Sequence, residues 1–242
     1  MAHISRQELK RDELKTTFEE FEEFVKRRAK DIVAVAGIVI VVAGLAGGLK
    51  VYQERQQADA NERLGVALRT FRAYVGTAVP GGLMPAMQTF PTARDKYKKA
   101  LEQFQEIVQK HSRYPRPKAV AIARYHIGLC QALLGDQAAA TKTLQEAARD
   151  ADPNLAALAQ FALAGELVRV GKIEDAAKLY QELASRPTSA VPEVTARLAL
   201  ADAYRATQPA KARQIYAEME KKFGSDAVLA QVLKEQVASL AK

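Results

Sequence analysis

An uncharged run of eighteen residues near the start of the chain constrains its fold more than any other feature. The run extends from Ile32 to Leu49 and reads IVAVAGIVIVVAGLAGGL. A helix of this length rises about 27 Å, which is close to the thickness of the hydrocarbon core of a bilayer. The sequence therefore predicts one transmembrane helix over residues 32–50, with a short segment before it and a large water-soluble part after it.

The flanks of this run predict its orientation. Four basic residues precede it closely and two follow it: Lys26, Arg27, Arg28 and Lys30 before, Lys50 and Arg55 after. Basic residues are retained on the cytoplasmic side, so residues 1–31 are predicted to be cytoplasmic and residues 51–242 periplasmic at a bacterial inner membrane. Two alternatives are disfavoured. A signal peptide cleaved near Gly44-Leu45-Ala46 is disfavoured because signal peptides usually have a shorter apolar core than this run. A soluble core helix is disfavoured because such a helix has a polar face, which this run lacks.

The side chains expected to anchor the chain in the bilayer are Ile32, Val35, Ile38, Val42, Leu45 and Leu49. Gly44 and Gly48 form one G-x-x-x-G pattern, which lets two helix backbones approach closely. The lipid bilayer is thus a predicted partner, and a homodimer through Gly44 and Gly48 is a second option.

The segment before the run is predicted to be an amphipathic helix. Ser5 and Glu8 fit a capping box, and apolar residues recur on one helical face at Leu14, Phe18, Phe21 and Val25. Two interpretations remain open: a helix that rests on the membrane surface, or one that docks on a partner protein.

Composition predicts that residues 51–242 form an all-α domain. Alanine, leucine and charged residues dominate this part, and long β-branched runs are absent. The chain carries a formal net charge of +8, but its basic residues are spread along the sequence rather than interleaved with aromatic ones. Nucleic acid is therefore not an expected partner. Cys130 is the single cysteine and is predicted to be a core residue.

A repeat of 36 residues organises this domain. Ala140, Ala176 and Ala212 are spaced by 36 residues, and a large residue follows each by four positions: Leu144, Tyr180 and Tyr216. Gly135 and Gly171 keep the same spacing and are expected to end helices in a left-handed conformation. We therefore predict helical hairpins, with helices near residues 51–75, 93–111, 117–134, 137–150, 154–170, 173–186, 191–206 and 209–222, a capping helix near 226–241, and a loop over 76–92.

This period and its alternation of small and large residues resemble the tetratricopeptide repeat. Gly128, Ala164 and Leu200 fall at the small position of each first helix, and Leu200 departs from the pattern. The resemblance implies a helical-hairpin superhelix whose first helices line a concave face. Residues predicted to lie on or near that face include Ile122, Leu158 and Val194, and the candidate partner-binding residues are Tyr125, Leu129, Phe161, Val168 and Tyr204.

No arrangement of residues indicates catalysis, a metal site or a cofactor site. The histidines are His3, His111 and His126, and none has a spaced Cys, His or acid cluster around it. The glycine-rich stretches lack the strand, Lys and Ser/Thr context of a phosphate-binding loop. We expect Asp150 and Asp152, beside a turn, to cap the helix after Pro153. An enzyme with a helical-repeat body is accordingly the least favoured class.

The layout of arm, span and exported repeats resembles the YfgM-type ancillary subunits of the bacterial SecYEG translocon. This resemblance implies a non-enzymatic scaffold that binds a chaperone, the translocon or an emerging chain beside the export channel. The alternative is a structural accessory subunit of another membrane complex, respiratory or photosynthetic, in which the span packs against a fixed core.

Overall fold

The computed structural model describes residues 28–76, 89–111, 117–149 and 152–240. The amphipathic arm with Ser5, Glu8 and Leu14 lies outside these ranges, as do Asp150 and most of the predicted loop 76–92. The chain divides into two compact units, residues 1–55 and 56–242.

The described elements are almost entirely helical, as predicted. In order they are α2 (Ala29–Phe71), β1 (Tyr74–Val75), β2 (Thr89–Phe90), α3 (Ala93–Lys110), α4 (Lys118–Leu134), α5 (Gln137–Ala147), α6 (Pro153–Arg169), α7 (Ile173–Ser185), α8 (Glu193–Tyr204), α9 (Pro209–Phe223) and α10 (Ala227–Ser239). The two short strands were not predicted. They form a parallel pair in which Tyr74 lies opposite Thr89 and Val75 opposite Phe90, so that the ends of the predicted loop are held together.

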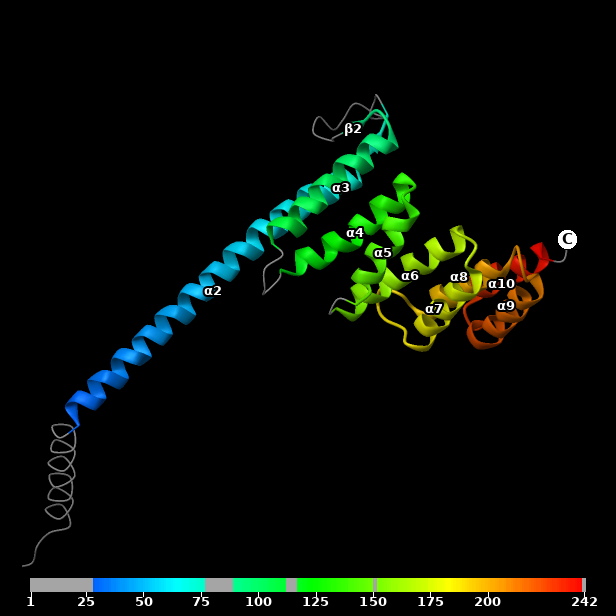
Figure 1. Cartoon of the computed structure of the whole chain (residues 1–242). Helices are drawn as coiled ribbons and strands as arrows, with labels where there is room; N and C mark the ends of the chain where they lie inside the picture. Colours follow the sequence, from blue (N-terminus) through cyan, green and yellow to red (C-terminus); the bar gives the residue numbers. More distant parts are fainter. Residues whose placement is uncertain (1–27, 77–88, 112–116, 150–151, 241–242) are drawn as a thin grey trace, which may run out of the picture. The chain divides into compact units, whose positions relative to one another are not determined.

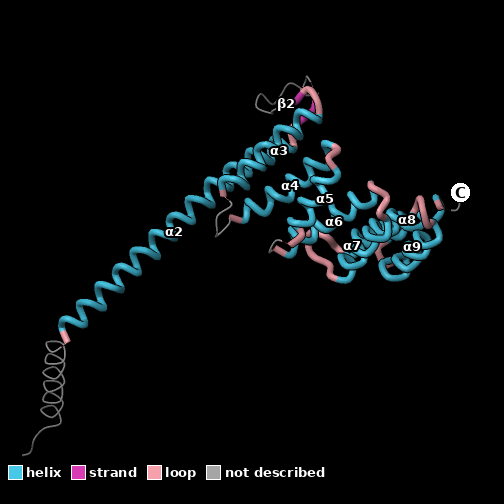
Figure 2. The backbone as a smooth tube through the Cα atoms, in the orientation of Figure 1, coloured by secondary structure: helices cyan, strands magenta, loops and turns pink. Residues whose placement is uncertain are grey.

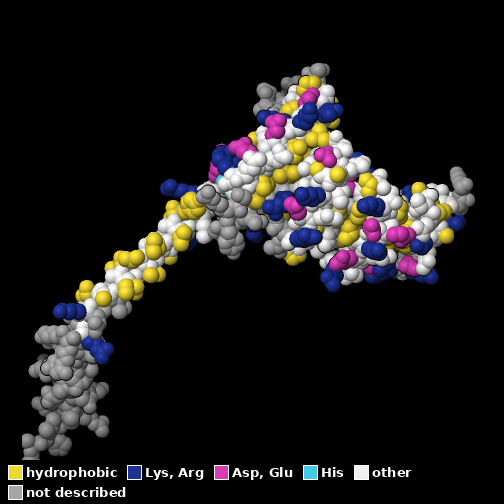
Figure 3. All heavy atoms as spheres, viewed as in Figure 1, with side chains coloured by type: hydrophobic (Ala, Val, Ile, Leu, Met, Phe, Trp, Pro, Cys, Tyr) yellow, Lys and Arg dark blue, Asp and Glu magenta, His cyan; other side chains and the backbone are white. Residues whose placement is uncertain are grey.

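In the first unit, the part of α2 from Gly37 to Leu49 carries no polar or charged side chain. Ile38, Val42, Leu45 and Leu49 each expose 58–64% of their surface, and hydrophobic side chains cover the visible face of this part of the helix (Figure 3). The side chains of Ile32 and Val35 are not among those described. Among the described residues, one helix is long and apolar enough to span a membrane, within Gly37–Phe71.

The glycines of the G-x-x-x-G pattern leave one side of this helix open. A Cβ atom built on Gly44 or Gly48 meets no other atom within 4 Å. The pairing of two copies of α2 through these glycines stays a prediction.

The second unit is a row of antiparallel helical hairpins (Figures 1 and 2). From α3 to α10, each helix packs against the next one along the chain. One hydrophobic cluster joins α2, α3 and α4 around Phe104 and Ile107. A second cluster extends from Leu144 to Leu233 and unites α5 to α10. Cys130 is fully buried in the first cluster, as expected.

Matching turns, 36 residues apart, join the two helices of successive repeats. Gly135 and Gly171 end α4 and α6 with φ values of +87° and +79°, a conformation that glycine adopts without steric cost. The backbone N–H of Asp136 donates to the Gln131 carbonyl at 2.9 Å, and 36 residues later Lys172 donates to Leu167 at 2.8 Å. The same turn thus returns the chain for the second helix of each repeat.

Side-chain caps mark the start of several helices. The Asp152 carboxylate accepts hydrogen bonds from the backbone N–H groups of Asn154 and Leu155, at 2.9 and 3.2 Å, as predicted for the start of α6. Pro153 occupies the first turn, where its missing N–H leaves no donor unpaired. Thr92 and Asp226 cap α3 and α10 in the same way.

A candidate protein-binding groove

A groove of about 670 Å³ separates the first halves of α4 and α6. This volume is typical of a ligand site rather than of a packing defect. Most of the lining is apolar. The residues that form it are Pro117, Lys118, Val120, Ala121, Ile122, Tyr125 and His126 from the α4 side, and Asp152, Pro153, Asn154, Leu155 and Leu158 from the α6 side.

The repeat explains why these two walls match. Pro117 and Pro153 are 36 residues apart, and so are Ile122 and Leu158. Equivalent helices of successive repeats therefore present equivalent residues to the same space.

Polar groups in the groove are few. The Asp152 carboxylate is occupied as the cap of α6. Burial raises the pKa of Tyr125, so its hydroxyl keeps its proton and can donate a hydrogen bond. Lys118 is exposed at the start of α4, where no acidic residue occupies the first turn.

His126 connects the groove to the hydrophobic cluster of the first hairpin. Its Nδ1–H donates to the Ile122 carbonyl at 2.9 Å, because a carbonyl oxygen can only accept. Its ring stacks on Phe104 with centroids 5.0 Å apart and meets Phe71 edge-on at 5.3 Å. Burial is the main cause that lowers the pKa of His126, and the charge of Arg72 adds to it. The neutral imidazole therefore forms part of the groove wall.

The structure brings some of the predicted partner-binding residues together and separates others. Tyr125 lines the groove, together with Ile122 and Leu158. Leu129, Phe161, Val168 and Val194 are half-buried and do not line it. The Phe161 ring packs against Tyr180 at 5.3 Å. Tyr204 is only 4% exposed, and its hydroxyl donates to Glu174 at 3.1 Å, so the structure places it in the core.

Sequence reasoning missed several lining residues, notably Val120, Ala121 and Leu155. Val120 lies three residues after Pro117 and Leu155 two residues after Pro153, and this proline pair, 36 residues apart, marks the same end of both helices. The repeat spacing was thus the signal that could have located this end of the groove.

The described residues show no arrangement suited to metal binding or nucleophilic chemistry. They hold no group of three or more His, Cys, Asp or Glu side chains that could bind a metal ion. Burial raises the pKa of the Cys130 thiol to about 12, which keeps it protonated and unreactive at neutral pH.

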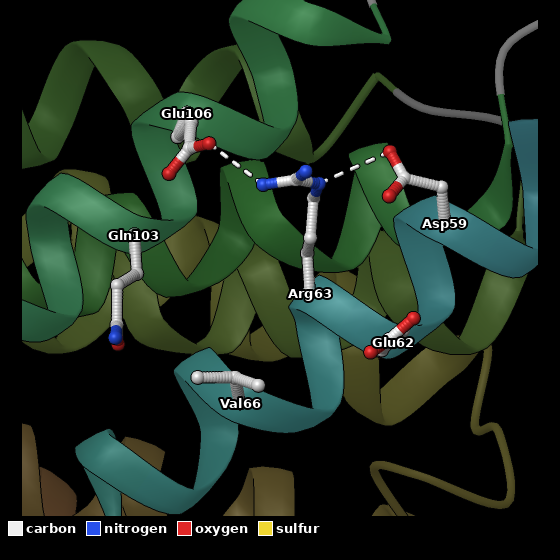
Figure 4. A pocket seen from close by; sticks show the side chains of 6 residues that line it. All are labelled: Asp59, Glu62, Arg63, Val66, Gln103 and Glu106. Atoms are coloured by element: carbon white, nitrogen blue, oxygen red, sulfur yellow. Dashed lines mark hydrogen bonds and ion pairs between the residues drawn. The ribbon is translucent and has the colours of Figure 1, made fainter.

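A smaller pocket of about 270 Å³ lies between α2 and α3 and is charged rather than apolar. Figure 4 shows Arg63 between two carboxylates. Its Nε donates to Asp59 Oδ2 at 3.0 Å and its Nη1 to Glu106 Oε1 at 2.7 Å. The hydrogen bond from Arg63 is the main cause that lowers the pKa of Asp59. Because Arg63 of α2 pairs with Glu106 of α3, we interpret this pocket as a link between the two helices.

His111 extends this link into the interior. Its side chain is 2% exposed, and Nε2 lies 3.1 Å from Asp59 Oδ2, an ion-pair distance without hydrogen-bond alignment. Its Nδ1 lies 2.7 Å from Gln56 Oε1. Gln56, Asp59 and Arg63 of α2 thus share one polar network with Glu106 of α3 and with His111, which directly follows α3.

Comparisons with known proteins agree with this architecture. Residues 123–153, which include α5 and most of α4, match the tetratricopeptide repeat family. No curated protein matches the sequence. A crystal structure of nearly identical TPR-like repeats from Podospora anserina, described as those of a kinesin light chain, is similar with a TM-score of 0.51 and 14% identity, over 76% of this chain and 96% of that one. The chain therefore has a tetratricopeptide-like repeat fold, combined with one helix able to span a membrane.

Proposed function

We propose that this protein is a non-enzymatic, membrane-anchored scaffold that binds a partner protein in the groove between α4 and α6. The observation that carries the proposal is the groove itself, because an apolar channel of about 670 Å³ lies between matching helices of successive repeats. Tetratricopeptide-like repeats generally mediate protein–protein interactions, and a groove with these walls suits an apolar segment of a partner.

The anchor and its flanks support the finer part of the proposal. The exposed apolar face of α2 needs a lipid environment or a membrane protein beside it. The excess of Lys and Arg before Ile32 favours a cytoplasmic N-terminus and an array on the periplasmic side of a bacterial inner membrane. There the anchor keeps the groove at high local concentration near an export channel and its chaperones.

A matched pair of substitutions tests the groove. Ala121 lines it and is half-buried, whereas Ala138 is exposed on α5. Ala121→Glu fills the groove with a charge without removing core packing, and Ala138→Glu makes the same chemical change away from it. Partners are captured in intact cells through a photoreactive residue at position 125 and identified by mass spectrometry.

The expected result is capture by the parent chain and by Ala138→Glu, with loss of capture in Ala121→Glu. Recovery of translocon components or periplasmic chaperones supports the export role. One stoichiometric respiratory or photosynthetic complex instead supports an accessory subunit. Equal capture by both variants, each folded by circular dichroism, contradicts the groove as the binding site.

A further inference from the structure

Basic residues occur along the whole sequence, but one end of the first helical hairpin holds a dense group of them. Residues 69–99 contain six basic residues and one acid, a net charge of +5. We call this set the basic end; it comprises Arg69, Arg72, Arg94, Lys96, Lys98 and Lys99. None of these residues lines the groove between α4 and α6.

The fold gathers residues that are far apart in sequence. Arg69 lies in the last turn of α2 and Arg72 directly follows this helix, and the other four lie in the first turns of α3. The pairing of β1 with β2 holds the two helix ends side by side, and the Phe71 and Tyr97 rings touch with centroids 5.6 Å apart. Figure 3 shows several Lys and Arg side chains at this end of the hairpin, near β2 in Figure 1.

The charges of the basic end are largely uncompensated. Arg69, Arg72, Arg94 and Lys98 are exposed, and none forms an ion pair with an acid among the described residues. The acid of this segment, Asp95, accepts a hydrogen bond from the Thr92 hydroxyl at 2.7 Å. Lys99 is neutralised in part by Glu102 at 3.3 Å.

Helix stability does not explain these cations. Arg94 and Lys96 lie in the first turn of α3, where the helix dipole favours acids and disfavours bases. Like charges crowded on one hairpin also repel one another. A surface that is unfavourable in the free protein but attracts anions is typical of a binding surface.

The two strands beside the cations favour an extended peptide as the anionic ligand. The sheet has two strands, so each has one edge without a strand partner in the described part of the chain. Such an edge can accept an extended peptide as a further strand. Tyr74 on β1 is 41% exposed, and Lys96 lies over the Tyr97 ring at 4.5 Å, so aromatic surface adjoins the charges.

We propose that the basic end binds an acidic, extended segment of a partner protein. The backbone edge supplies register, and the cations supply attraction to alternate acidic side chains. This surface is distinct from the groove, and the proposal does not depend on whether the groove binds a partner.

The test uses the full chain in a non-ionic detergent and a synthetic peptide of about twelve residues that alternates Glu and Thr. A peptide with Gln in place of Glu measures the contribution of charge. The test variant combines Arg69→Gln, Arg72→Gln, Arg94→Gln and Lys98→Gln. The control variant removes four exposed cations elsewhere: Lys142→Gln, Arg149→Gln, Arg213→Gln and Lys221→Gln.

The expected result is that the test variant binds the acidic peptide about tenfold more weakly than the parent chain, whereas the control changes less than about twofold. Raised salt should weaken binding by the parent chain and hardly affect the test variant. If the fourfold variant fails to fold by circular dichroism, the pair Arg94→Gln and Lys98→Gln serves in its place. Equal losses of affinity for the acidic peptide in the test and control variants overturn the proposal. Binding of the Gln peptide to the parent chain as tightly as the Glu peptide also overturns it.

Two further probes distinguish other anions. Vesicles with anionic phosphatidylglycerol test a lipid surface, and a single-stranded DNA oligomer tests nucleic acid. Binding of either probe without binding of the acidic peptide overturns the assignment to a protein segment.

Discussion

Tyr216 shows how one hydroxyl can distinguish otherwise equivalent repeats. It is fully buried, and its hydroxyl donates to Asp202 Oδ1 at 2.6 Å across the α8–α9 hairpin. Tyr180 occupies the same position one repeat earlier and packs against Phe161. Its hydroxyl has no comparable carboxylate bond among the described residues. Spacing predicted a large side chain at both positions, but the role of each hydroxyl depends on the neighbouring helix.

A Tyr216→Phe substitution should therefore destabilise the array more than Tyr180→Phe. We expect a loss of about 1 to 2 kcal/mol in the free energy of unfolding, because the substitution removes a hydrogen bond to a partly exposed carboxylate. Tyr180→Phe, the matched control, should cost less than about 0.5 kcal/mol. Urea unfolding monitored by circular dichroism measures both; equal effects would show that the Asp202 contact contributes nothing.

Alkaline pH should also weaken the fold through its tyrosines. Burial raises the pKa of Tyr125, Tyr180 and Tyr204, that of Tyr180 to about 12, and burial with the Asp202 contact raises that of Tyr216. Above about pH 10 the unfolded chain releases these protons and the folded chain retains them, so unfolding becomes more favourable as pH rises. Because burial also raises the pKa of Cys130, its thiol should likewise make unfolding more favourable as pH rises above about 9.

The measurement is urea unfolding at a series of pH values from about 8 to about 11. Stability should be constant at the lower end and fall at the upper end, and the fall should be shallower in Tyr216→Phe. A stability that rises with pH in this range would contradict the burial of these hydroxyls.

At the scale of elements, the close approach of α4 and α5 depends on Gly128. A Cβ atom at this position would lie 2.7 Å from Leu144 Cγ and 2.8 Å from its Cδ2, well inside contact distance. Gly165 occupies the interior of α6, but a Cβ there meets only the Tyr180 hydroxyl, at 3.8 Å. Gly128 is thus required for close helix packing, whereas the position of Gly165 has room for a side chain.

Gly128→Ala should destabilise the protein by about 1 to 3 kcal/mol, because Leu144 must move to relieve the clash. Gly165→Ala should instead stabilise it by about 0.5 to 1 kcal/mol, since alanine restricts the unfolded chain and favours the helix. Thermal unfolding of the two variants measures the difference in sign. A neutral or stabilising Gly128→Ala would mean that α4 and α5 are less tightly packed than the structure indicates.

The sequence predicts the elements better than it predicts the site. Turn glycines, proline starts and apolar spacing located the helices, because these signals act within one hairpin. The groove depends on which neighbour covers each apolar stripe. Tyr204 and Tyr125 both lie on apolar faces, but Tyr204 is covered and bonded to Glu174, whereas Tyr125 faces open space. The strands β1 and β2 escaped prediction because each is two residues long and stable only when paired.

At the scale of the whole molecule, α2 has two parts with different surroundings. Its part from Gly37 to Leu49 exposes apolar side chains, whereas Ala60, Leu64 and Ala67 are buried in the hydrophobic cluster with α3 and α4. The first repeat therefore takes its first helix from the continuation of the apolar segment. The apolar run and the first buried residues of the array belong to the same helix, but the buried core begins only after the apolar run ends.

Removal of residues 1–50 should therefore separate membrane attachment from folding. The truncated chain keeps Gln56, which contacts His111, and every buried core residue from Ala60 onward. We expect it to remain in the aqueous fraction of lysed cells, with a helical circular dichroism spectrum and a melting temperature within a few degrees of that of the full chain in detergent. The full chain should stay in the membrane fraction after an alkaline carbonate wash, because eighteen uncharged residues favour the bilayer. A full chain released by carbonate would contradict the anchor, and a truncated chain that does not fold would show that the array needs the first fifty residues for its own stability.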